Sequence, residues 1–161
     1  AAHYPKVRGP VTQGKGPDAE GVEDRKGSRV RAASAHDPLT ASIPGADSRV
    51  VGGVQLDIVR TGTGRIKRAI YPAGFRWSTH MKPVTHTETC EHAHVGFLAR
   101  GRIHVHFPDG CVQEYEAPAA LAIEPGHDAW VMGDEPAVLI EVDFEGDTIA
   151  RFGLPSGHRH A

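Results

Sequence analysis

Short stretches of alternating apolar and polar residues after residue 50 constrain the fold more than any other feature of the chain. Alternation places successive side chains on opposite faces of a strand, so each stretch predicts one half-buried β-strand. Turn sequences such as Pro108-Asp109-Gly110 and Glu124-Pro125-Gly126 separate the stretches. The predicted strands are Val54–Arg60, Ile66–Tyr71, Val95–Ala99, Ile103–Phe107, Cys111–Tyr115, Ala120–Ile123, Ala129–Met132, Ala137–Phe144 and Thr148–Phe152. Many short strands without a long helical segment predict an all-β sandwich or a jelly-roll barrel, which can hold a small ligand in its mouth.

The composition changes near residue 50. Of the ten aromatic residues only Tyr4 lies before Tyr71, and residues 1–50 are rich in Gly, Pro, Ala, Ser and mixed charge. Such a segment buries too little apolar surface to offset the loss of chain entropy on folding. The sequence therefore predicts a flexible or extended N-terminal arm over residues 1–50 and a single barrel domain over residues 51–161.

Charge and cysteine content limit the partners and the compartment. The formal net charge of −2 gives no general attraction to nucleic acid or to anionic lipid, so neither is an expected partner. The apolar runs are far shorter than the roughly 20 residues that a membrane-spanning helix needs. Two cysteines, Cys90 and Cys111, do not make a disulfide scaffold, and we expect reduced thiols in a cytoplasmic protein, with a single bridge between the two as the alternative.

Histidine is unusually frequent, with 11 residues in a chain of 161, and seven of them lie between His80 and His127. Imidazole is the commonest metal ligand in proteins and transfers protons near neutral pH. Strand alternation separates these residues into two groups. Ile103 and Val105 are the apolar members of their strand, so His104 and His106 are expected on the opposite, solvent-facing side.

The spacing of glycine and histidine resembles the first motif of the cupin superfamily, which runs Gly, five residues, His-x-His, a Glu and a later Gly. Gly74 and His80 occupy the first two positions, and His94 precedes Gly101 by seven positions as the family Glu does. Lys82 replaces the second histidine, and the spacing between Lys82 and His94 is longer than in the family.

The second cupin motif is similar to the segment Ile123–Trp130. Gly126 is kept, Ala129 stands where the family has a histidine, and His127 comes two residues early. Positions 127 and 129 have the same strand parity, so His127 is expected to point into the same cavity. The segment from Gly126 to Pro136 also resembles small single-domain bacterial cupins, and the resemblance as a whole covers about residues 53–153.

The resemblance implies a double-stranded β-helix, the cupin jelly-roll barrel, with a divalent metal held by three histidines and a carboxylate. We expect Zn, Fe, Mn or Ni in a repaired version of that site. The alternative is a degenerate barrel in which the inward histidines only line a polar pocket. The expected metal ligands are His80, His94 and His127, with His92, Glu88 or Cys90 in a fourth place, His92 being the first choice.

Two basic and two aromatic residues are the expected ligand-binding residues. Arg76 and Lys82 would face an anionic molecule from the rim of the cavity, or else be ordinary surface charges. Trp77 and Trp130 would form the wall of the pocket or part of the core.

The fold supports several functions, so the chemistry must come from the site. The first hypothesis is a binding or sensing module for a small polar or anionic molecule, acting with or without a metal. The second is a metal-dependent enzyme, an oxygenase or isomerase acting on a small organic acid or sugar. A purely structural role, with the arm reaching a neighbouring subunit, is a third. The cupin resemblance also implies a homodimer, formed by pairing of sheets or exchange of edge strands, and the arm could cover an exposed strand edge.

Overall fold

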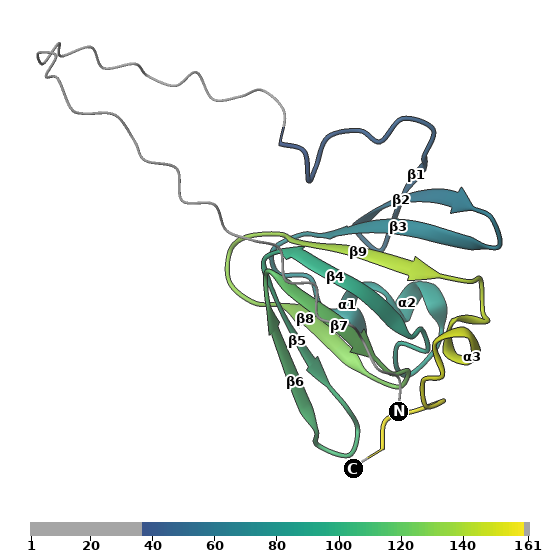
Figure 1. Cartoon of the computed structure of the whole chain (residues 1–161). Helices are drawn as coiled ribbons and strands as arrows, with labels where there is room; N and C mark the ends of the chain where they lie inside the picture. The colour runs from purple at the N-terminus through teal and green to yellow at the C-terminus, as the bar shows by residue number, and fades with distance from the viewer. Residues whose placement is uncertain (1–36, 160–161) are drawn as a thin grey trace, which may run out of the picture. The chain divides into compact units, whose positions relative to one another are not determined.

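Nine strands form two antiparallel sheets in the computed structural model, which describes residues 37–159 (Figure 1). The larger sheet has the strand order β1-β2-β3-β9-β4-β7, and the smaller one has the order β6-β5-β8. The larger sheet consists of β1 (Asp47–Val51), β2 (Val54–Thr61), β3 (Gly64–Tyr71), β9 (Ala137–Asp143), β4 (His94–Arg100) and β7 (Ala119–Ile123). The smaller sheet consists of β6 (Val112–Glu116), β5 (Arg102–His106) and β8 (Asp128–Val131). The predicted all-β jelly-roll fold is thus confirmed.

The core lies between the two sheets and is made by the inward members of the alternating strands. Leu98, Val105 and Phe107 are fully buried, and Leu139 is almost so. His104 lies opposite Trp130 in the register of β5 and β8, on the face away from Val105, and His106 is exposed. The outward orientation predicted for His104 and His106 is confirmed.

Residues 37–50 belong to the barrel, which corrects the boundary predicted at residue 51. Asp47–Val51 pairs along its whole length with β2 as an edge strand. Upstream of it, Asp37 forms a 2.6 Å ion pair with Arg100, and the carbonyl oxygen of Leu39 accepts a hydrogen bond from Arg68. Residues 1–36 of the predicted arm lie outside the described residues, so that part stays a prediction.

The last predicted strand is wrong, because Thr148–Phe152 forms the short helix α3. Asp147 and Arg151 form an ion pair at i, i+4 spacing, which stabilises a helical turn. Gly153 ends the helix in the left-handed conformation that glycine adopts most easily. Two further short helices lie between β3 and β4, α1 (Trp77–His80) and α2 (Lys82–Thr85). In the described part of the chain, no helix is long and apolar enough to cross a membrane.

Candidate metal centre and cavity

Three potential metal ligands meet between the sheets. One donor atom from each of Cys90, His94 and His127 lies within 4.8 Å of the other two. The Cys90 sulfur is 3.4 Å from Nε2 of His94, and the ring centres of His94 and His127 are 5.3 Å apart. Cys90 and His127 are buried, and the His94 side chain is only 14% exposed. The cluster therefore sits inside the barrel.

Backbone pairing holds the cluster together. Cys90 and His127 form an isolated antiparallel bridge, in which the Cys90 amide donates to the His127 carbonyl over 2.8 Å. The amide of Gly126 also donates to the Cys90 carbonyl over 2.7 Å. His94 is the first residue of β4 and pairs with Ile123 at the end of β7. Residues from three separate segments are thus brought to one place.

Hydrogen bonds fix the orientation of both imidazole rings. Nδ1 of His94 contacts a carboxylate oxygen of Glu141 on β9. Nδ1 of His127 is 2.7 Å from the backbone carbonyl oxygen of Glu124, to which it donates. With each Nδ1 engaged in this way, Nε2 of each ring remains as the nitrogen that can bind a metal.

Glu141 belongs to a row of alternating charges on the inner side of β3 and β9. Lys67 bridges Glu141 and Asp143, with nitrogen–oxygen distances of 3.3 and 2.8 Å. Arg65 then pairs with Asp143 at 2.6 Å and with Glu145 at 2.9 Å. The row leads from the exposed Glu145 to the buried His94 and holds Glu141 in place.

The buried charges shift the pKa values of the cluster. Burial alone would raise the pKa of Cys90, but the charge of His94 and hydrogen bonds from His127, His92 and His94 hold it well below its usual value. Burial alone would lower the pKa of His94, yet the charges of Glu141 and Cys90 raise it to about 10. Burial also opposes ionisation of Glu141, but His94 and Lys67 lower its pKa to about 2. The His94 ring thus lies between two groups that favour its protonated form, the Cys90 sulfur and the Glu141 carboxylate.

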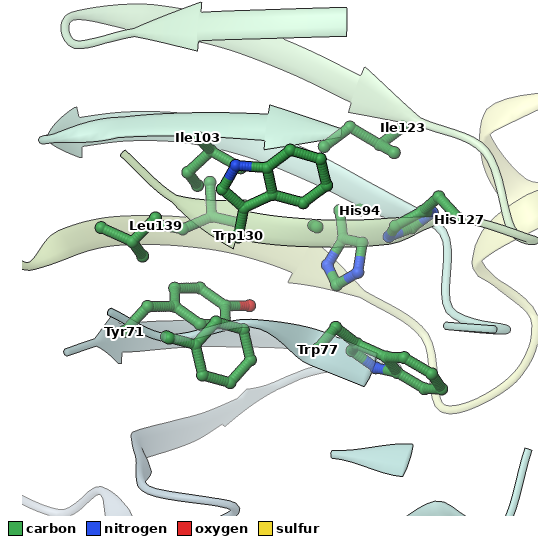
Figure 2. Close-up of a pocket in the computed structure, with 11 residues that line it drawn as sticks. Tyr71, Trp77, His94, Ile103, Ile123, His127, Trp130 and Leu139 are labelled. Carbon is green, nitrogen blue, oxygen red and sulfur yellow. The ribbon is translucent and has the colours of Figure 1, made fainter. Parts of the chain in front are cut away.

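A small cavity of about 40 Å³, partly open to solvent, adjoins the two histidines. Figure 2 shows His94, His127 and Trp77 gathered toward one end of it and Tyr71 and Leu139 toward the other. The remaining wall is mainly apolar, from Phe75, Ile103, Ile123, Ala129, Trp130 and Val131. A second opening, lined by Lys67, Thr87, His92 and Glu91 among others, reaches Cys90 and His94 from another side.

The donor set fits a divalent metal. Thiolate and imidazole are the ligands that Zn²⁺ and other borderline metals prefer. At metal sites, the ring nitrogen of a histidine that does not bind the metal usually donates a hydrogen bond to a carboxylate or a carbonyl oxygen, as Nδ1 does in both histidines here. Three protein ligands next to a cavity leave a coordination position for another molecule.

The structure places the four predicted metal ligands differently. It brings His94 and His127 together, but His80 is not part of the group. His80 ends α1, where Nδ1 contacts the backbone of Arg76 and the ring stacks on Phe75. His92 is exposed, and its ring centre is 6.5 Å from that of His94. His92 is therefore beside the cluster but not within it.

The four predicted ligand-binding residues also separate. Trp77 is buried and lines both openings. Trp130 lines the first cavity, and its ring also stacks on His104. Arg76 lies over the Trp130 ring at 4.5 Å and pairs with Asp128. Lys82 pairs with Glu88 at 2.6 Å. Of these four residues, Trp77 lines both openings and Trp130 lines the first, while each of the two cations has an acidic partner.

Sequence reasoning did not single out Glu141 and Lys67. Their signal was a pair of acids at alternating positions, Glu141 and Asp143, in an otherwise apolar strand. The strand paired with it carries Arg65 and Lys67 at alternating positions as well. Charges on the inner face of a strand indicate a buried polar network, and complementary charges on two strands indicate that the strands pair.

Comparisons with known proteins found similar chains among the solved structures. No protein-family model matches the chain, and no curated protein matches its sequence. Among solved structures, a Cupin 2 conserved barrel domain protein from Salinispora arenicola CNS-205 is similar at 14% identity, with a TM-score of 0.46, covering 66% of this chain and 88% of that one. The cupin domain of Cnp3 from Schizosaccharomyces pombe is 11% identical with a TM-score of 0.46, covering 71% of this chain and 80% of that one. A cupin-like protein from Thermotoga maritima MSB8 is 16% identical with a TM-score of 0.42, and the match covers 59% of this chain and 71% of that one.

Proposed function

From a cupin-type β-barrel with this inner cluster, we propose a module that binds or senses a small molecule at a divalent metal. Cys90, His94 and His127 would hold the metal, and the second opening, of about 250 Å³, would take the molecule together with the small adjoining cavity. The observation that carries the proposal is the fixed orientation of both rings, because Glu141 and the Glu124 carbonyl leave each Nε2 as the available donor.

Ligand chemistry narrows the expected metals. Of Zn, Fe, Mn and Ni, a thiolate with two imidazoles suits Zn, Fe or Ni, whereas Mn prefers carboxylate oxygen. When bound, the metal would supply a Lewis acid with a coordination position directed at the cavity. The protein's own part is to orient the donors and to release the proton between Cys90 and His94 as the metal enters.

The walls of the cavity indicate the shape of the ligand. Tyr71, Trp77 and Leu139 offer apolar surface, while polar groups come mainly from the cluster and from Lys67 at the second opening. The small polar or anionic ligand expected from the sequence would therefore also need an apolar part. We propose a small molecule with one polar, metal-binding group and an apolar body that packs on Trp77.

The metal part is tested by measuring the metal content of the purified protein and its affinity for Zn²⁺ and Fe²⁺. Cys90→Ser and His94→Ala should each lose the metal of this cluster. His104→Ala is the matched control, because His104 lies on the outer face against Trp130 and Glu114. An undiminished number of bound ions, held at wild-type affinity, in both Cys90→Ser and His94→Ala would refute the proposal.

The ligand part is tested by fluorescence. Trp130→Phe leaves Trp77 as the only tryptophan of the chain, and Trp77 lines the cavity. Screening small carboxylic acids with apolar tails against the metal-loaded Trp130→Phe variant should find molecules that change its emission. The change should disappear in a Trp130→Phe, His94→Ala double variant. An unchanged response in the double variant would show binding that is independent of the metal.

The alternative function is a metal-dependent enzyme, an oxygenase or isomerase. The observation in its favour is the same set of three protein donors beside a cavity, which leaves room for a substrate. A stoichiometric redox metal in the cluster, together with chemical conversion of a ligand found in the screen, would establish the enzyme. Reversible binding without conversion would establish the binding module.

A further inference from the structure

The C-terminal segment returns to the barrel after α3 and places a histidine against the turn between β5 and β6. The ring of His158 stacks on Phe107, with a centroid distance of 3.8 Å and an interplanar angle of 18°. One donor atom from each of Asp109, Cys111 and His158 lies within 4.8 Å of the other two. This second group combines a carboxylate, a thiol and an imidazole from two distant parts of the sequence.

The turn orients two of these donors. Oδ1 of Asp109 accepts a hydrogen bond from the Cys111 amide over 2.9 Å, which fixes the carboxylate within the turn. The other carboxylate oxygen, Oδ2, lies 3.9 Å from Nε2 of His158. A cation between these atoms would need only small side-chain movements to reach about 2.0 to 2.3 Å from each donor.

A fourth residue supports the histidine from the other side. Oε2 of Glu124 lies 3.6 Å from Nδ1 of His158, just beyond hydrogen-bond length. This oxygen is buried and accepts no hydrogen bond from any residue between 37 and 159. A buried carboxylate oxygen without a hydrogen bond is costly. A cation on Nε2 would make Nδ1–H of His158 a stronger donor to Glu124, as in other carboxylate–histidine–metal arrangements.

We propose that Asp109, Cys111 and His158 form a second divalent-cation site, which fastens the C-terminal segment to the end of the barrel. Thiol and imidazole donors select a borderline cation of the Zn²⁺ class and disfavour Mg²⁺ and Ca²⁺, which prefer oxygen ligands. The carboxylates of Asp109 and Glu124 add negative charge that attracts the cation.

The second site is separate from the first. The fully buried ring of Phe107 touches both histidines, with its centre 3.8 Å from that of His158 and 5.9 Å from that of His127. Glu124 contributes to both, its carbonyl oxygen holding His127 and its carboxylate facing His158. Because the two sites use different donor residues, substitutions can remove either one alone.

The test is a Zn²⁺ titration with stoichiometry measured on the full chain. The wild type should bind two ions, and both Cys90→Ser and His94→Ala should keep one. Adding Cys111→Ser or His158→Ala to Cys90→Ser should remove that ion, with a loss of affinity of at least about tenfold. His106→Ala, an exposed histidine on β5, is the matched control and should leave the stoichiometry unchanged.

Each outcome separates this site from the first. An ion lost in Cys111→Ser and His158→Ala but kept in Cys90→Ser and His94→Ala supports the second site, even when the first binds nothing. An ion that survives in the Cys90→Ser, Cys111→Ser double variant overturns it, and so does the absence of Zn²⁺ binding in both Cys90→Ser and His94→Ala. Fastening is measured by hydrogen exchange of residues 153–159, which Zn²⁺ should slow in the wild type but not in His158→Ala. Binding without slower exchange would refute the fastening.

Discussion

Glu141 acts on the proposed metal through His94, which makes it a positioning residue. Glu141→Gln keeps a hydrogen-bond acceptor beside Nδ1 of His94 but removes the negative charge. Nε2 of His94 then binds a metal ion more weakly. We expect metal affinity at the Cys90 cluster to fall by about 10- to 100-fold. Equilibrium competition with a chelator measures the change. The matched control is Glu114→Gln, because Glu114 holds the outward-facing His104 in the same way, and equal losses in both variants would refute the role.

The residues of the candidate site were predictable only in part. The cupin motif positions, together with strand parity, placed His94 and His127 at the site, and Cys90 was among the three residues considered for a fourth ligand. His80 was misplaced because the cupin spacing implied a strand position, whereas residues 77–80 form α1. Glu141 contacts His94 from a strand 47 positions further along the chain. A contact of that kind depends on which strands pair, and alternation within one strand carries no such information.

At the scale of elements, the close approach of β4 and β9 depends on Gly96. A Cβ atom at this position would lie 2.0 Å from the carbonyl oxygen of Ile140, well inside van der Waals contact. Gly96→Ala should therefore lower the free energy of unfolding by about 3 kcal/mol or more, since two paired strands would have to separate. Urea titration measures the loss. Gly157→Ala is the control, because a Cβ there meets open space, and a loss below about 0.5 kcal/mol for Gly96→Ala would contradict the tight packing.

Strands with strong alternation were predicted well, and the two misassigned elements had weak or ambiguous patterns. Asp47–Val51 is largely exposed and includes Ser48 and Arg49, so it lacks the apolar face by which a strand is recognised. Polar residues are common on edge strands, where they discourage pairing with other chains. Thr148–Phe152 is only five residues long, and so short a segment fits a strand or one helical turn equally well.

At the scale of the whole molecule, the homodimer stays a prediction. The outer face of the larger sheet carries an apolar stripe on which a second copy would pack. Ile66 and Val142 pair across β3 and β9, Phe97 lies on the adjacent β4, and these side chains are 39–45% exposed. A second copy of the chain packed on this stripe would cover apolar surface. Sedimentation velocity at micromolar concentration should then show a dimer, and Phe97→Glu should shift it to monomer. A wild type that sediments only as a monomer would contradict the prediction.

The row of charges between the sheets gives the whole barrel a defined response to acid. Arg65 and Lys67 hold Asp143 in ion pairs of 2.6 and 2.8 Å, and its side chain is only 7% exposed. Burial alone would raise the pKa of Asp143, but these partners lower it to about 2, from 3.8 in an unfolded chain. Because the folded state has the lower pKa, this stabilisation is complete above about pH 4 and is lost as the pH falls toward 2.

The difference between the folded and unfolded pKa values of Asp143 corresponds to about 2 kcal/mol of unfolding free energy. This contribution is present only while Asp143 is ionised. Asp143→Asn should therefore lower stability at pH 7 by at least about 2 kcal/mol, because two half-buried cations, Arg65 and Lys67, lose a partner. Between pH 4 and pH 2, the stability of the variant should also decline less than that of the wild type, because the variant has no carboxylate at position 143 to protonate. Urea unfolding of the metal-free protein across this range measures both effects. Asp147→Asn, which removes an exposed ion pair with Arg151, should keep the wild-type slope, and an equally steep decline in Asp143→Asn would show that other carboxylates govern the acid response.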